Sequence, residues 1–188
     1  MKAGGDIVLE TERLILRTIT EGDVALHDRV LNTPAVMEHL GGVLELHEIE
    51  AKHAKNMALH AREGFSFLML IEKDTGELVG HAGIKRVDRP AAPTHGDHEV
   101  GWLYREDRWR RGLAFEAMVA VLDWAFSRVD APHVVALTSR ANLGSWKLME
   151  KLGMERRRNL DFTDPAFPDS ENPTIQYALT RDTWKEQP

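Results

Sequence analysis

The stretch RWRRGLAFEA, residues 108–117, carries more structural information than any other part of the chain. It follows a strand-like run at His98–Tyr104, and apolar residues recur at helical spacing from Leu113 onward. A strand, a turn of glycine and arginines and a helix start direct unpaired backbone N–H groups and the positive end of a helix dipole to one point. Gly112 allows close approach of a ligand to the backbone, and the arginines add charged donors. The stretch is therefore predicted to bind a phosphate or pyrophosphate.

The composition excludes several classes of protein. The 188 residues fit one domain spanning residues 1–188, and the formal net charge of −6 gives no reason to expect binding to nucleic acid or to an anionic membrane. No apolar segment typical of a signal peptide follows Met1, and the longest apolar run, residues 65–71, is too short to cross a bilayer. The lack of cysteine excludes a cysteine nucleophile, a thiolate metal site and disulfides, and it fits a cytoplasmic protein.

Apolar periodicity and turn residues predict a mixed order of strands and helices. The expected strands cover residues 9–18, 65–72, 78–87, 98–104, 134–138 and 174–180. Helices are expected from Thr20 to about Leu31, over residues 46–62 before Gly64, from Leu113 to about Ala125, and after Asn142 up to Gly153. This order indicates an α+β fold rather than a strict βα repeat.

The arginine and glycine turn has an alternative interpretation as an ordinary surface turn with solvated arginines. It is neither a P-loop, because no Gly-Lys-Ser/Thr follows, nor a dinucleotide fingerprint, because the glycine triplet is missing. The second informative stretch, residues 142–154, can likewise be explained as a capped amphipathic helix. The two stretches together, at their spacing in the chain, favour a functional interpretation over these structural ones.

The pair resembles the GNAT superfamily of acetyl-CoA-dependent N-acetyltransferases, in particular the Rim-type branch that acetylates ribosomal-protein N-termini. The resemblance rests on residues 99–102, 109–117 and 142–154, and the opening at residues 11–17 is similar to the first strand of the branch. It implies a splayed, mostly antiparallel sheet of about seven strands flanked by helices. It also implies direct transfer of an acetyl group from acetyl-CoA to a primary amine, with no metal.

Matching positions carry the family's site onto this chain. The resemblance implies that the CoA pyrophosphate contacts the backbone of Arg110, Arg111, Gly112, Leu113, Ala114 and Phe115. The pantetheine arm would pair with the backbone of Leu103, Tyr104 and Arg105 like an added strand, and a strand N–H near Leu103 would stabilise the oxyanion. Asn142 would contact the pantetheine, and Ser145 would lie near the thioester sulfur.

Two positions depart from the superfamily pattern. Trp109 replaces the glutamine or arginine three residues before the glycine, which matches the Rim-type branch. Met149 occupies the position of a tyrosine that protonates the leaving thiolate in many members, and methionine has no proton to donate. That role passes to Ser145, to water or to no group, because a thiol with a pKa near ~8.5 is already a tolerable leaving group.

Glu99 is the candidate general base, acting through water on an amine that must be neutral to attack. Its alternative interpretation is an ion-paired strand carboxylate. His81 is expected to be an interior histidine or a contact of the acceptor amine, and His53 and His60 are expected to form a solvated stripe.

Two further clusters have alternative interpretations. His95, Asp97 and His98 could hold a divalent metal, although a polar loop entering a strand explains them equally. Residues 156–158, three arginines, are expected to be a charge run at the end of a strand.

The acceptor side is expected to be acidic. A cationic acceptor follows from six residues in the segments that border the acceptor in this family: Glu38, Glu45, Asp161, Asp164, Asp169 and Glu171. The acceptor is expected to be a protein or peptide N-terminus, with small amines as alternatives, and a homodimer is possible. Two other functions stay open: a CoA-binding regulatory module without catalysis, and a metal-dependent hydrolase.

Overall fold

The computed structural model describes residues 4–186, and its centre is one mixed sheet with the strand order β1-β2-β3-β4-β5-β6-β8-β7. Neighbouring strands are antiparallel except β5 and β6, which are parallel. The strands are β1 (Ile7–Glu10), β2 (Leu14–Arg17), β3 (Phe67–Glu72), β4 (Leu78–Arg86), β5 (His98–Tyr104), β6 (His133–Ser139), β7 (Glu155–Arg156) and β8 (Thr174–Thr180). The predicted open, mostly antiparallel sheet is confirmed, with eight strands among the described residues rather than about seven.

Two strands were not among the six ranges expected from the sequence: the short β7, and one at the start of the chain. Residues 9–18 were predicted to form one strand, but β1 and β2 form a hairpin in which Glu10 pairs with Ile15. Thr11 turns the chain, because its N–H donates to the carbonyl of Leu14 at 2.9 Å and its hydroxyl accepts from the Leu14 N–H at 3.0 Å. The prediction was wrong because alternating apolar residues continue on both sides of this tight turn.

The helices are α1 (Val24–Val30), α2 (Pro34–Met37), α3 (Leu46–Glu63), α4 (Leu113–Ser127), α5 (Leu143–Lys151) and α6 (Arg181–Lys185). The prediction over residues 46–62 is confirmed, and Gly64 ends α3 in the left-handed conformation, with φ 77°. The helix expected from Thr20 is shorter, since a 3-10 turn at Glu21–Asp23 precedes α1. No helix in the described part of the chain is long and apolar enough to cross a membrane.

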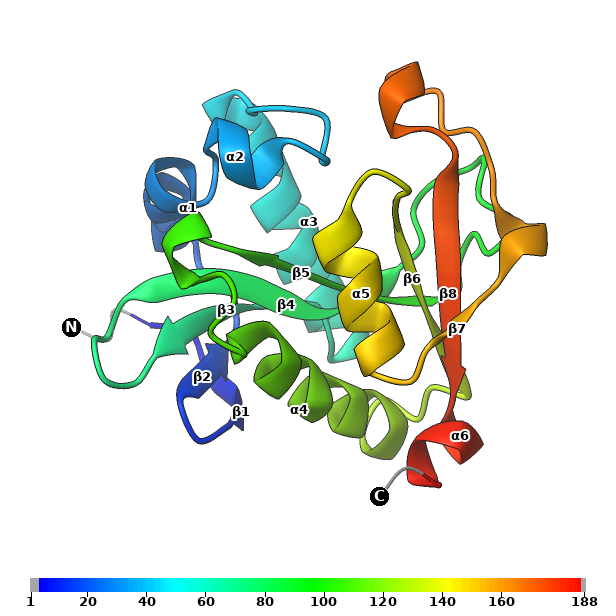
Figure 1. Cartoon of the computed structure of the whole chain (residues 1–188). Coiled ribbons are helices and arrows are strands. Elements are labelled where there is room, and N and C mark those ends of the chain that lie inside the picture. Colours follow the sequence, from blue (N-terminus) through cyan, green and yellow to red (C-terminus); the bar gives the residue numbers. More distant parts are fainter. Residues whose placement is uncertain (1–3, 187–188) are drawn as a thin grey trace.

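The two faces of the sheet pack against different helices. Leu68 and Leu70 belong to the core cluster that includes the buried face of α4, whereas Met69, between them, packs with residues of α1 and α2. This division follows from the alternation of side chains along a strand. Figure 1 shows α1, α2 and α3 together at one side of the sheet, with α4 and α5 in front of it.

The sheet opens between its two parallel strands. β5 and β6 pair in register at Glu99 and Val135 alone, and Figure 1 shows β3, β4 and β5 running across the view while β6 and β8 run nearly upright. Because β5 and β6 are parallel, their C-terminal ends lie at the same edge of the sheet. The helices that follow them, α4 and α5, therefore both begin at this opening.

Candidate active site

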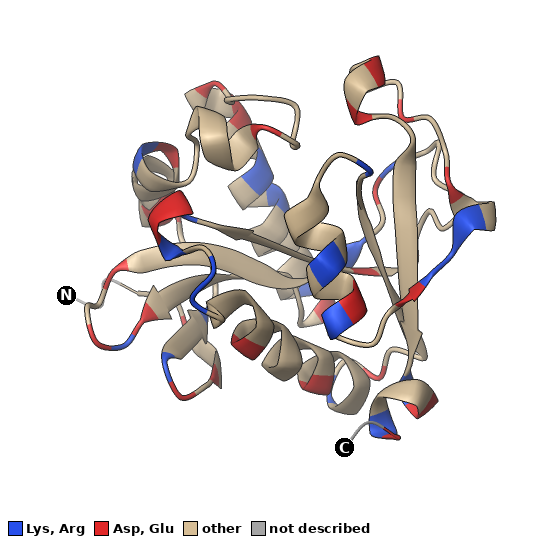
Figure 2. Cartoon of the chain, viewed as in Figure 1, with Lys and Arg blue, Asp and Glu red and all other residues tan. Residues whose placement is uncertain are grey.

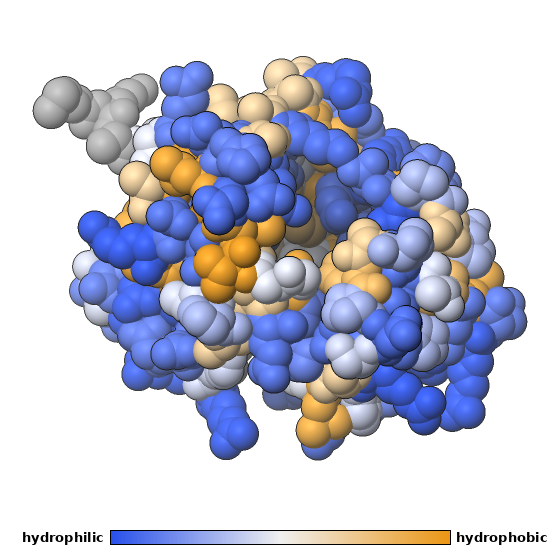
Figure 3. Space-filling model, turned by 90° about the horizontal axis from the view of Figure 1, so that it is seen from above, coloured by the Kyte–Doolittle hydropathy of each residue, from blue (hydrophilic) through white to orange (hydrophobic). Residues whose placement is uncertain are grey.

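A cavity of about 1380 Å³ lies at the opening between β5 and β6. Its wall combines the turn before α4 and the first two turns of α5 with residues of α3, β3, β4 and β5 from the other face. Figure 3 views the molecule from above and shows a hollow bordered by hydrophobic and polar residues. Trp109, just before α4, and Leu143, the first residue of α5, are apolar wall residues that are 47% and 49% exposed. One cavity thus connects the predicted cofactor residues to the opposite face of the sheet.

The turn before α4 has the backbone geometry that the sequence predicted. Arg110 and Gly112 have positive φ angles of 61° and 79°, and Gly112 is the N-cap of α4. No side chain among the described residues caps this helix end, so its first N–H groups are free for a ligand. A Cβ atom at position 112 would have one heavy-atom neighbour within 4 Å outside its chain neighbours, Nη2 of Arg13 at 3.5 Å. The turn is therefore an open helix N-terminus, a geometry that suits an anion, and it is called the anion-binding turn for the role predicted from the sequence.

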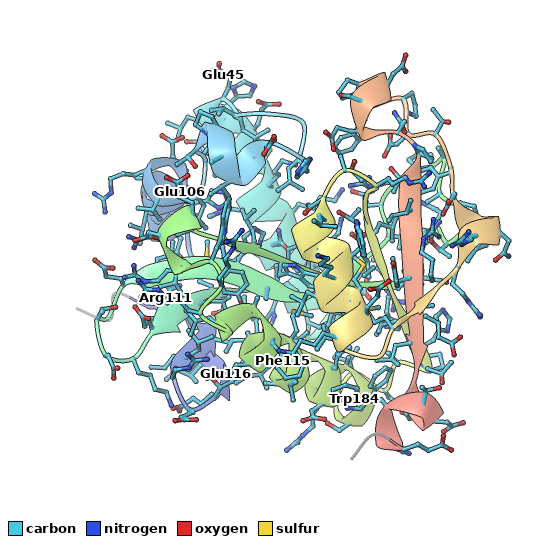
Figure 4. All side chains as sticks on the ribbon, in the orientation of Figure 1. Glu45, Glu106, Arg111, Phe115, Glu116 and Trp184 are labelled. Atoms are coloured by element: carbon cyan, nitrogen blue, oxygen red, sulfur yellow. The ribbon has the colours of Figure 1, made fainter. Side chains whose placement is uncertain are left out.

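Glu116 connects the first turn of α4 to the β1–β2 hairpin. Its carboxylate accepts hydrogen bonds from the Thr11 hydroxyl at 2.5 Å, the Arg13 N–H at 2.8 Å and Arg13 Nε at 2.6 Å. Arg13 Nη1 donates in turn to the carbonyl of Arg111 at 2.9 Å. Figure 4 shows Arg111 and Glu116 at this end of α4. The hairpin therefore positions the anion-binding turn, a role that the sequence analysis did not predict.

The arginines of the turn have different surroundings. The guanidinium of Arg108 pairs with Glu72 at 3.1 Å and with Glu77 at 2.8 Å, and Arg105 pairs with Glu77 at 3.2 Å. The side chains of Arg105 and Arg108 thus form ion pairs within the protein. Arg110 lies on the cavity wall, whereas Arg105 and Arg111 do not.

The backbone N–H and C=O groups at the end of β5 point alternately toward β4 and toward the opening beside β6. The Arg105 N–H donates to the carbonyl of Val79 on the side of β4 at 2.9 Å, and residues bonded to one partner alternate along an antiparallel strand. Leu103 and Arg105 therefore direct their backbone polar groups at β4, while Trp102 and Tyr104 direct theirs at the opening beside β6. Of the three predicted pantetheine residues, Tyr104 alone presents its backbone to the gap. Its carbonyl already accepts from the indole Nε1 of Trp109 at 2.8 Å.

Both tyrosine hydroxyls are hydrogen-bonded within the protein, which argues against a role for either in proton transfer. The hydroxyl of Tyr104 is buried and donates to the carbonyl of Leu113 at 3.4 Å, and burial raises its pKa. The hydroxyl of Tyr177 donates to Glu150 Oε1 at 3.2 Å.

The start of α5 also lines the cavity. Asn142 is the N-cap, and its Oδ1 accepts from the Ser145 N–H at 3.1 Å. Asn142, Ser145 and the buried Met149 all line the cavity. Lys151 lies over the ring of Phe115 at 4.3 Å from its centroid, which links α5 to α4 at the position labelled in Figure 4.

Glu99 lies on the other half of the wall, on the face of the sheet toward α3. Its side chain is 8% exposed, and Nζ of Lys85 lies 3.1 Å from its Oε2. The contact is an ion pair, but its angles do not make a hydrogen bond to Oε2. Glu99 therefore forms the ion pair of its alternative interpretation and also lines the cavity, and its role as general base stays a prediction.

Three histidines form one cluster in this half. The rings of His27 and His53 lie 5.0 Å apart and share a hydrogen bond of 3.0 Å, and His81 lies 5.7 Å from His27. Burial lowers the pKa of all three, that of His27 to about 4. The prediction of a solvated stripe was wrong for His53, which is 3% exposed. Its spacing of four residues from the buried Ile49 already indicated the inward face of a helix.

The predicted acidic acceptor side is largely absent from the cavity wall. Of the six carboxylates, Glu38 lines the cavity. Asp161 pairs with Arg156 at 2.6 Å, Glu171 shares a hydrogen bond with His39, and Glu45 precedes α3 as its N-cap residue. The wall instead includes lysines and arginines of α3, β4 and the loop after β4, which the sequence analysis missed because they are scattered along the chain: Lys52, Lys55, Lys85, Arg86 and Arg89.

The two remaining clusters, at residues 95–98 and 156–158, have structural explanations. His133 shares a hydrogen bond of 3.0 Å with Asp97, and His98 lies against the ring of Phe65. Within the described chain no group of three or more His, Cys, Asp or Glu is placed to hold a metal ion. Arg156 ends the short strand β7, as expected for the run of residues 156–158.

The fold and this site define a GNAT acetyltransferase. The family model of the acetyltransferase (GNAT) domain matches residues 13–155, and the chain belongs to that family. It is therefore an acyltransferase.

Known proteins agree with this assignment. The chain is 28% identical over 158 residues to the uncharacterized N-acetyltransferase YoaA of Bacillus subtilis, covering 79% of this chain and 83% of YoaA. It is 30% identical to the crystal structure of an acetyltransferase from Agrobacterium tumefaciens, with a TM-score of 0.73 over 91% of this chain and 92% of the other. RimL, a ribosomal-protein acetyltransferase solved with coenzyme A, shares the fold, with a TM-score of 0.74 at 19% identity over 95% of this chain and 99% of RimL.

Proposed function

We propose that this protein transfers an acetyl group from acetyl-CoA to a primary amine in a ternary complex. One observation carries the proposal: a single cavity joins the uncapped N-terminus of α4 to a wall with a buried carboxylate and neutral imidazoles on the opposite face. RimL and an aminoglycoside acetyltransferase of the same fold were each solved with coenzyme A, which supports the choice of donor. The cysteine-free composition fits the cytoplasm as the place of action.

The cofactor half offers groups that suit CoA. The free N–H groups from Gly112 to Phe115 and the side chain of Arg110 would bind the pyrophosphate, because a helix N-terminus favours anions. The pantetheine arm would lie in the gap between β5 and β6 and bond the backbone of Trp102 and Tyr104. In this arrangement the thioester would lie next to Ser145, which lines the cavity at the start of α5.

The chemistry needs a neutral amine and a stabilised oxyanion. The amine nitrogen attacks the thioester carbonyl, and a strand N–H from Trp102 or Tyr104 stabilises the oxyanion. The amine proton passes to Glu99 through water, and the C–S bond breaks to release CoA as the thiolate or thiol. Ser145 or water protonates the sulfur, since Met149 has no proton to donate. His81 lines the same wall, which supports a role as hydrogen-bond acceptor for the amine.

Release of CoA thiol tests the proposal directly. Purified protein is mixed with acetyl-CoA and a panel of primary amines that includes N-terminal peptides, amino acids and polyamines. We expect amine-dependent thiol release, with the N-acetyl product identified by mass spectrometry. Tight CoA binding without any amine-dependent release would identify a regulatory CoA-binding module instead. Hydrolytic activity that a chelator abolishes would support the metal-dependent alternative.

A further inference from the structure

We propose that the acceptor carries a carboxylate close to its amine, and that Lys52 binds this carboxylate in the acceptor half of the cavity. The inference rests on the proposed function, since it names the class of substrate for the same site. It reverses the expectation of a cationic acceptor, which came from six acidic residues, of which Glu38 alone lines the cavity.

Basic side chains approach this half of the cavity from three elements. Lys52 and Lys55 lie on α3, Lys85 lies on β4, and Arg89 lies on the loop after β4. Figure 2 shows basic segments on α3 behind the sheet. Lys55, Lys85 and Arg89 each have a carboxylate partner: Asp88, Glu99 at 3.1 Å and Asp164 at 3.0 Å, respectively. Asp88, Glu99 and Asp164 are thus each paired with a cation, and of the wall carboxylates Glu38 alone has no Lys or Arg partner among the described residues.

Lys52 differs from these three cations. Among residues 4–186 no carboxylate lies within ion-pair distance of its ammonium, and Glu48, one turn earlier on α3, interacts with it at longer range only. Desolvation by the surrounding protein and then the charge of Lys85 lower the pKa of Lys52; Glu48 opposes them, and Arg89 and Lys55 lower the pKa by smaller amounts. The local potential is positive, and the ammonium of Lys52, which has no carboxylate partner, can pair with a ligand anion.

The histidine cluster next to Lys52 adds no negative charge. His53 follows Lys52 on α3, and burial keeps His27, His53 and His81 neutral near neutral pH. Positive charges also lower the pKa of His81, including those of Lys52 and Lys85. A cationic acceptor such as a polyamine would therefore enter a region of like charge, whereas a carboxylate would be attracted.

The same potential assists the reaction. An ammonium close to positive charges loses its proton more easily, because the charged form is disfavoured. The acceptor's carboxylate pairs with Lys52 and orients the molecule, while its amine reaches the neutral form needed for attack at the wall of Glu99 and His81. One group of cations thus selects the acceptor and favours its nucleophilic state.

Matched pairs of acceptors test the proposal. β-Alanine is compared with propylamine, and a peptide that begins with aspartate is compared with one that begins with lysine, by CoA-thiol release. We expect kcat/KM to be about tenfold or more higher for the carboxylated member of a pair, which corresponds to about 1.4 kcal/mol or more. The amino-acid pair and the peptide pair distinguish a free amino acid from an acidic N-terminus as the source of the carboxylate. Equal rates within both pairs, or faster reaction of propylamine and the lysyl peptide, would overturn the proposal.

Variants of Lys52 tie the preference to this side chain. In Lys52→Gln we expect the ratio of kcat/KM within each pair to fall to near one, and in Lys52→Glu to invert. Lys185→Gln, an exposed lysine of α6 away from the cavity, is the matched control and should keep the wild-type ratio. A wild-type ratio in Lys52→Glu would contradict the assignment.

A binding measurement separates this inference from the proposed function. If no amine releases thiol, the proposed function fails, but the subsite can still be measured. CoA-loaded protein is titrated calorimetrically with N-acetyl-β-alanine and with N-propylacetamide. Tighter binding of the carboxylate, lost in Lys52→Glu, supports the subsite, and equal or absent binding of both overturns it.

Discussion

Replacement of Glu116 by alanine removes the contact that connects the β1–β2 hairpin to the anion-binding turn. The Thr11 hydroxyl, the Arg13 N–H and the Arg13 guanidinium then lose their acceptor. Each of the first two part-buried donors contributes about 1 kcal/mol, and the Arg13 pair adds about 0.5 kcal/mol because its side chain is 42% exposed. The free energy of unfolding should fall by about 2–3 kcal/mol.

Urea and thermal unfolding measure this loss. For a chain of this size the decrease corresponds to about 5–10 °C in Tm. Glu12→Ala is the matched control, since Glu12 is an exposed carboxylate on the same hairpin and should leave Tm nearly unchanged. Because Arg13 also donates to the carbonyl of Arg111, the Glu116 variant should bind CoA several-fold more weakly as well. A Tm within about 1 °C of wild type, together with unchanged CoA affinity, would refute the role given to Glu116.

The pH dependence of the wild-type protein has a defined sign at this contact. Burial raises the pKa of Glu116, but its hydrogen bonds from Thr11 and Arg13 outweigh this effect and lower it overall. The stabilisation is therefore complete above the unfolded pKa near ~4.3 and is lost as the pH falls through the folded value. The difference in stability between wild type and Glu116→Gln should shrink over the same acidic range.

Three other predictions concern the site. Ser145→Ala should lower kcat more than it changes the KM for acetyl-CoA, and equal kcat would remove Ser145 from the mechanism. Glu99→Gln should lower kcat/KM at neutral pH or move the pH–rate profile upward, whereas an unaltered profile would leave Glu99 as the ion-pair partner of Lys85 alone. Burial lowers the pKa of His27 to about 4, so the free energy of unfolding should decrease by up to about 1.4 kcal/mol per pH unit as the pH falls from ~6.5 to ~4. Urea unfolding of His27→Gln should show a weaker dependence of stability on pH. An equal dependence would contradict the neutral buried state of His27.

Local signals in the sequence were sufficient to predict the turn and the two helix starts that line one end of the cavity. The glycine and arginine turn, the helix from Leu113 and the cap at Asn142 each depend on neighbours within a few residues, and all were found where predicted. The hairpin turn at Thr11 was missed because its signal is a hydroxyl that bonds a backbone N–H three residues later, inside an unbroken alternating pattern.

The other half of the cavity, proposed here to hold the acceptor, depends on contacts between distant residues. Lys85 meets Glu99 across two strands, and His27 meets His53 across two helices 26 residues apart in the chain. Glu116 reaches Thr11 over 105 residues. Composition and spacing cannot report which charges a fold brings to one wall, so the sequence predicted acidic residues where the cavity wall has Lys52, Lys55, Lys85, Arg86 and Arg89.

The affinity of CoA for Gly112→Glu, measured by calorimetry, tests most directly the claim that the turn before α4 binds the CoA pyrophosphate. The substitution places a negative charge at the helix N-terminus and competes with phosphate for its N–H groups and for Arg13. Gly76→Glu is the matched control, because Gly76 has a similar φ of 69° and lies in the β3–β4 turn, away from the cavity. We predict at least a hundredfold weaker CoA binding in Gly112→Glu and wild-type affinity in Gly76→Glu. Wild-type affinity in a folded Gly112→Glu protein would contradict the assignment.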